Sequence, residues 1–154
     1  MKLLGFFAVM ALVMAGGIGL LSTAAAQNES ADKKELEKFQ GRWVLVSATI
    51  DGKAWEEDEI KHRSVVFKGE KLTLLYKDKE RGTISLKIDP SKSPAQIDAT
   101  FEDGPRKGET LKGIYKFDGD TLTRCFVGIG KDRPTEFASK PGSGTVLSVH
   151  KRAK

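Results

Sequence analysis

Segments in which hydrophobic and polar residues alternate follow one another through most of the chain. Ile84, Leu86 and Ile88 are separated by single residues, and residues 96–102 repeat this alternation. A period of two places successive side chains on opposite faces of a β-strand, so each segment is typical of a half-buried strand. The eight segments of this kind span residues 43–50, 63–68, 71–77, 83–89, 96–102, 110–117, 121–127 and 145–151.

Short turns separate most of these segments. Asp118-Gly119 is typical of a two-residue β-hairpin, and Asp51-Gly52 and Lys68-Gly69 are similar. Hairpins in series place sequence neighbours side by side, and closure into a barrel removes the exposed strand edges. We therefore expect an all-β fold, an eight-stranded antiparallel up-and-down barrel. A sandwich of two sheets is the alternative.

Two segments have helical character. Residues 28–40 place Leu36 and Phe39 on one face, which predicts a short N-terminal helix. Residues 55–62, after the first strand, have four acidic residues at 56–59, directly after Trp55, and the dipole of a helix favours acidic side chains at its start. We expect one or two helical turns there, and these acidic residues need no catalytic role.

The first 26 residues differ from the rest of the chain. An apolar run covers residues 3–21, and Ala24-Ala25-Ala26 supplies the small residues that signal peptidase accepts. We therefore predict export to the periplasm, cell envelope or exterior after cleavage near Ala26, leaving a single domain over residues 27–154 with no stable membrane insertion. An uncleaved anchor is the alternative, because the run is nearly long enough to span a bilayer.

Composition and spacing argue against several classes of function. The net charge is +5, but both signs of charge are mixed along the chain, without the basic, aromatic-rich face of a nucleic-acid binder. The histidines and the single cysteine lack the spacing of a zinc site, and Asp103, Asp118 and Asp120 lack that of a calcium loop. No metal, cofactor or nucleic acid is expected.

Candidate catalytic residues are few. Cys125 lies within an apolar segment with no base nearby in the sequence, so we expect a buried, unreactive thiol. His62 ends a polar helical turn and His150 lies in the last strand, and we expect both at the surface. The chain is therefore not expected to be an enzyme.

Gly41-Arg42-Trp43 follows directly on the predicted N-terminal helix. It resembles the G-x-W motif that opens the lipocalin-like (calycin) barrels. In that group the tryptophan closes one end of the barrel, and a basic residue from late in the chain packs on it. The resemblance implies that Trp43 is a structural plug, with Arg124 or Arg152 against it.

Three longer stretches are similar to a family of small exported proteins abundant in planctomycetes. They are KELEKFQGRW (34–43), GIYKFDGDTL (113–122) and RPTEFASKPGSG (133–144). The resemblance implies a lipocalin-like fold and export, and it implies no activity.

Two functions fit these observations. The first is a module that binds a small apolar or amphipathic ligand, with Tyr115, Phe117, Arg124 and Phe126 lining the site and Arg124 pairing with a carboxylate. Arg124 is equally compatible with packing on Trp43 or facing water. Because side chains alone can fill an eight-stranded barrel, the second function is a solid-core structural or interaction domain. It would act through its surface and the charged loop 128–144, which is either a lid or a packed segment anchored by Phe137.

Overall fold

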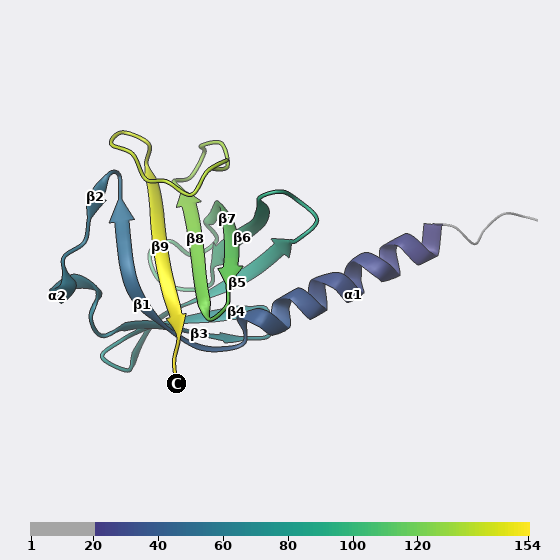
Figure 1. Ribbon diagram of the computed structural model, residues 1–154, viewed down its shortest axis with the longest axis horizontal. Coiled ribbons are helices and arrows are strands. Elements are labelled where there is room, and N and C mark those ends of the chain that lie inside the picture. The colour runs from purple at the N-terminus through teal and green to yellow at the C-terminus, as the bar shows by residue number, and fades with distance from the viewer. Residues whose placement is uncertain (1–20) are drawn as a thin grey trace, which may run out of the picture.

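Eight antiparallel strands close into a barrel in the computed structural model of the protein, which describes residues 21–154 (Figure 1). Each barrel strand pairs with the next along the chain, and β1 (Gly41–Ile50) pairs with β9 (Thr145–Arg152), which closes the sheet. The predicted up-and-down barrel is confirmed, and the β1–β9 ladder rules out two separate sheets. The other barrel strands are β3 (Arg63–Lys68), β4 (Lys71–Tyr76), β5 (Lys79–Asp89), β6 (Ala95–Phe101), β7 (Thr110–Asp118) and β8 (Thr121–Val127).

Strand β5 begins earlier than its alternation predicts, and the two-residue strand β2 (Lys53–Ala54) was not predicted. Lys77 and Asp78 both have positive φ and form a tight turn, so Tyr76 pairs with Lys79. The first residues of β5 are polar and exposed, so no alternation marks them as a strand. Strand β2 folds back on the end of β1 through the turn at Asp51 and Gly52.

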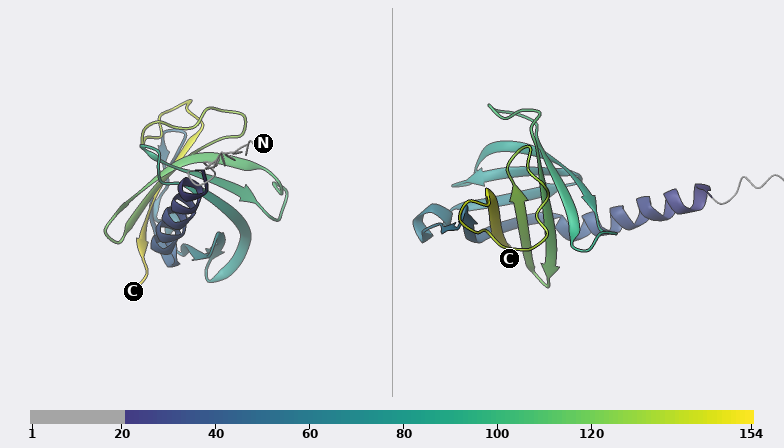
Figure 2. Two further views of the ribbon diagram at one scale, coloured as in Figure 1. Left: turned by 90° about the vertical axis from the view of Figure 1, so that its right-hand side faces the viewer. Right: turned by 90° about the horizontal axis from the view of Figure 1, so that it is seen from above.

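Both predicted helices are present, with different ends. α1 (Leu21–Phe39) buries Phe39 and packs Leu36 against the core, while its N-terminal part projects from the barrel (Figure 2). α2 (Glu57–Ile60) begins with a capping box, in which the backbone N–H of Glu56 donates to the Glu59 carboxylate at 2.7 Å.

The predicted signal segment, residues 1–26, lies largely outside the described residues. Its last part, residues 21–26, belongs to α1. Over residues 21–154, no helix is long and apolar enough to cross a membrane.

An aromatic cluster fills one end of the barrel, which we call the closed end. It consists of Phe39, Trp43, Phe67, Tyr115 and Phe117, with ring centroids 4.8 to 5.9 Å apart. Burial of such a side chain stabilises the fold by about 1.5–3 kcal/mol. The last turn of α1 contributes Phe39, so the helix closes this end of the barrel.

The loop 128–144 packs over the outside of the barrel. Arg133 holds it there by donating to the carbonyl oxygens of Ile97 at 3.1 Å and Gly113 at 2.8 Å. Beneath the loop, Cys125 is fully buried as predicted, and its thiol contacts the carbonyl oxygen of Ala138 at 3.5 Å. Burial raises the pKa of this thiol, so it stays protonated at neutral pH.

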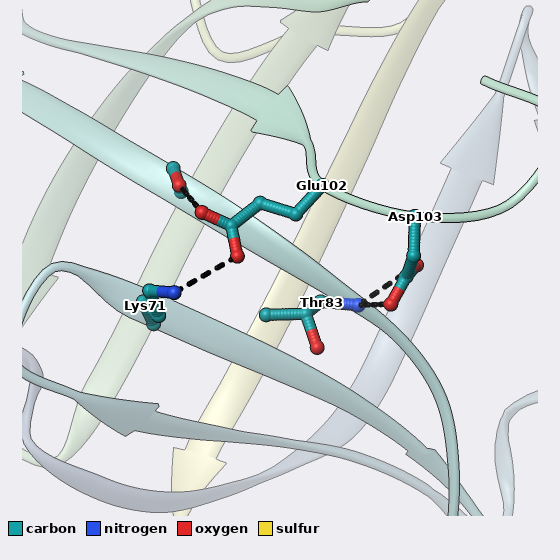
Figure 3. Close-up of polar contacts among 5 residues, drawn as sticks. Lys71, Thr83, Glu102 and Asp103 are labelled. Carbon is teal, nitrogen blue, oxygen red and sulfur yellow. Dashed lines mark hydrogen bonds and ion pairs between the residues drawn. The ribbon is translucent and has the colours of Figure 1, made fainter. Parts of the chain in front are cut away.

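The connection between β6 and β7 is fixed by two carboxylates. Glu102 accepts from Lys71 at 3.0 Å and from the Ser85 hydroxyl, and Asp103 accepts from the backbone N–H of Thr83 (Figure 3). The Ser85 hydroxyl and then Lys71 lower the pKa of Glu102. These carboxylates serve the fold, and no three potential metal-ligating side chains gather within the described part of the chain.

Candidate functional site

A cavity of about 220 Å³ lies inside the barrel, away from the closed end. From β1 it is lined by Leu45, Ala48 and Ile50, and from β9 by Val146, Ser148 and His150. Trp43 and Arg152 pair with each other beyond this stretch, toward the closed end. Much of its wall is aliphatic, from Leu45, Ala48, Ile50, Val65, Leu74 and Val146.

A β-bulge in β1 turns the side chains that follow it toward this cavity. Leu45 pairs with His150 and Ser47 pairs with Val149, so Val46 is the extra residue. The bulge reverses the alternation, and Ala48 and Ile50 therefore face inward after it. The small side chain of Ala48, opposite Ser148, leaves room that a larger residue would fill.

Arg124 brings a positive charge to the cavity wall. Its side chain is 7% exposed, and it lies over the rings of Phe67 and Phe126 at 5.6 and 5.8 Å. Burial lowers its pKa to about 10, so the guanidinium is charged at neutral pH. It forms no ion pair within the described residues, and its Nε is buried without a hydrogen-bond partner. A buried charge without a counter-ion is costly, by several kcal/mol.

His150 lies beside Arg124 and is only 3% exposed, so its predicted surface position is wrong. Burial and then the charge of Arg124 hold the pKa of His150 well below its usual value, and the ring is neutral at pH 7. Its Nε2 lies 3.3 Å from Nη2 of Arg124 and accepts that hydrogen bond, which assigns the ring proton to Nδ1. Nδ1 is buried without a partner among residues 21–154, so Nε of Arg124 and Nδ1 of His150 are two N–H donors of the cavity wall that no described residue satisfies.

Two further arginines lie where the cavity meets solvent, and with two aromatic rings they form what we call the rim. The guanidinium of Arg63 lies 4.9 Å from the Trp55 ring and 5.3 Å from the Tyr76 ring, and that of Arg81 lies 5.6 Å from the Tyr76 ring. Both arginines line the cavity, and none of the acidic residues that the structure describes does.

The chain has seven arginines, and ion pairing divides them into two groups. The three that line the cavity have no carboxylate partner among residues 21–154, and the other four each have one. The four pairs are Arg42 with Asp78, Arg106 with Glu109, Arg133 with Asp98 and Arg152 with Asp120.

Of the four residues predicted to line a ligand site, the structure places only Arg124 in the cavity wall. Tyr115 and Phe117 belong to the closed end, where the hydroxyl of Tyr115 lies 3.4 Å from Glu35. Phe126 folds over Gly113, at which a Cβ atom would lie 2.5 Å from the Phe126 ring.

Trp43 is fully buried, and Arg152 rather than Arg124 packs on it.

Sequence reasoning missed His150 and the rim. The hairpin at Asp118-Gly119 could have predicted that Arg124 faces inward. It fixes the register of β7 and β8 so that Tyr115 lies opposite Arg124, and both side chains then point into the barrel.

This arrangement suits an amphipathic anion, with an apolar body against the aliphatic wall and an acceptor group at Arg124 and His150. No protein-family model matches the chain, and no curated protein has significant sequence similarity to it.

Proposed function

We propose that this protein is an exported binding protein that holds a small amphipathic carboxylate in the barrel cavity. The observation that carries the proposal is the buried guanidinium of Arg124, which has no carboxylate partner within the described residues and lies beside an aliphatic wall. A carboxylate matches the planar fork of a guanidinium, and charge-assisted hydrogen bonds are roughly twice as strong as neutral ones.

The cavity volume limits the size of the ligand. About 220 Å³ lies below the range of roughly 300–1,000 Å³ typical of pockets for drug-sized molecules. Medium-chain acids are therefore better candidates than long-chain fatty acids.

Export is part of this proposal, and its support is the sequence of residues 1–26. The resemblance of residues 34–43, 113–122 and 133–144 to a family of small exported proteins supports it too. If the protein is exported, its ligand is a molecule found outside the cytoplasm.

The alternative is a solid-core interaction domain that acts through its surface and the loop 128–144. The aromatic cluster favours it, because five aromatic side chains pack against one another at the closed end of the barrel. The two functions differ in one respect, since only the first requires saturable binding inside the barrel.

The test is calorimetric titration of the purified protein with octanoate and, separately, with 1-octanol. We expect saturable octanoate binding and much weaker octanol binding. Arg124→Gln should reduce octanoate affinity by at least about tenfold, because a hydrogen bond to a charged group contributes about 1.5–3 kcal/mol.

Arg106→Gln is the matched control, because Arg106 pairs with Glu109 on the surface and does not line the cavity. It should bind octanoate as the unmodified protein does. Absence of saturable binding, or equal affinity for acid and alcohol, would remove the proposal and leave the solid-core alternative.

A further inference from the structure

The rim arginines are held in place but have no anionic partner among the described residues. Arg63 lies near both Trp55 and Tyr76, and its Nε donates to the carbonyl oxygen of Glu59 at 2.6 Å. That contact uses one N–H group and leaves both terminal nitrogens of Arg63 for another acceptor. Stacking on aromatic rings orients a guanidinium without satisfying its charge.

We infer that the ligand is a dianion, with one carboxylate for Arg124 and a second oxyanion that Arg63 and Arg81 bind at the rim. This inference rests on the proposed function and names its ligand class. Every arginine outside the cavity lining has a carboxylate partner, so the three unpaired guanidiniums coincide with one site.

The charge balance of the lining favours two negative groups over one. The lining contributed by residues 21–154 contains three guanidiniums and no carboxylate, and His150 is neutral. A monoanion at Arg124 would leave two positive charges at the rim, whereas a second oxyanion between Arg63 and Arg81 would balance most of the charge. The aliphatic wall between the two positions calls for an apolar spacer, as in an α,ω-dicarboxylate.

The rim contribution should be moderate and dependent on salt. Arg63 and Arg81 are exposed, and an exposed ion pair contributes between about 1.4-fold and fivefold in affinity. Two such pairs predict a preference of about two- to twenty-five-fold for the dianion at low ionic strength. This preference should shrink at high salt, because exposed charges are screened.

The experiment compares four ligands of equal chain length by calorimetry: octanedioate, its monomethyl ester, octanoate and 1,8-octanediol. The proteins are the unmodified chain, the double variant Arg63→Gln/Arg81→Gln and Arg124→Gln, each checked for its fold by circular dichroism. We expect octanedioate to bind about two- to twenty-five-fold more tightly than its monoester or octanoate. In the rim variant that ratio should fall to about one, and Arg124→Gln should weaken all three acids.

The outcomes separate this inference from the proposed function. Octanoate binding with no preference for the diacid, or a preference that persists in the rim variant, would overturn the dianion inference and leave the proposed function standing. If neither octanoate nor octanedioate binds, the proposed function is wrong and the inference is wrong with it.

Discussion

The guanidinium of Arg152 lies over the indole of Trp43, with 4.2 Å between its central carbon and the ring centroid. Its Nη1 and Nη2 donate to the carbonyl oxygens of Gln40 at 2.7 Å and Lys38 at 2.8 Å. Trp43 in turn donates from Nε1 to the carbonyl oxygen of Phe39 at 2.6 Å. The two side chains therefore join the end of α1 to both strands that close the barrel.

Arg152→Ala should lower the free energy of unfolding by about 2–3 kcal/mol, because it removes a cation–π contact and two hydrogen bonds from a charged group. Arg152→Lys should recover little, because an ammonium lacks the planar fork. Urea denaturation measures both, with Arg106→Ala as a surface control expected to cost less than about 1 kcal/mol. If Arg152→Ala costs no more than the control, the contact does not hold the barrel closed.

Trp43→Ala should cost about 3–5 kcal/mol, the range for a core aromatic residue. Trp43→Phe should cost less, because it keeps most of the buried area and loses the hydrogen bond to Phe39. Thermal unfolding of the two variants tests this order. A melting temperature of Trp43→Ala close to that of the unmodified protein would refute the plug role.

Cys125 should react with a thiol reagent at neutral pH only as fast as the protein opens, because the thiol is buried and protonated. Cys125→Ala should lower the free energy of unfolding, because it removes a fully buried sulfur atom and its contact with the carbonyl oxygen of Ala138. Labelling kinetics with and without urea provide the check. Rapid, complete labelling of the native protein would contradict this burial.

The protein should lose stability as the pH falls from about 7 to 5. The folded-state pKa of His150 lies well below its unfolded value of about 6.5, so the unfolded chain binds the proton first and acid favours unfolding. The slope is at most about 1.4 kcal/mol per pH unit for one proton. The lowered carboxyl pKa values of Asp89 and Glu102 act only at more acidic pH, because their unfolded values are about 4.

Urea denaturation at several pH values, with His150→Gln alongside, measures this dependence. The variant should show a flatter profile between pH 5 and 7, because it has no imidazole to protonate. An equal slope in the variant and the unmodified protein would assign the pH dependence to other groups.

Local patterns predicted the strands well, because alternation depends only on which face of each strand is buried. They predicted neither the bulge at Val46 nor the start of β5 at Lys79, since both depend on how two strands pair. The choice between Arg124 and Arg152 as the partner of Trp43 also required the β1–β9 register, which pairs Trp43 with Arg152.

The cavity was less predictable than the fold, because its lining comes from strands far apart in the sequence. Ser148 and His150 are polar and lie two residues apart in β9, a spacing typical of the solvent-facing side of a strand. Both are nevertheless buried and line the cavity. Arg63 and Arg81 look like ordinary surface arginines in the sequence. Only the structure shows that they share one cavity with Arg124 and have no carboxylate partner within the described residues.

An NMR titration of the isotopically labelled protein with octanoate shows residue by residue where the ligand binds. We expect saturable shifts that are largest at Ala48, Arg124, Ser148 and His150, and small shifts at Phe117 in the closed end. Shifts that do not saturate, or that centre on the closed end or the outer surface, would contradict carboxylate binding in the cavity.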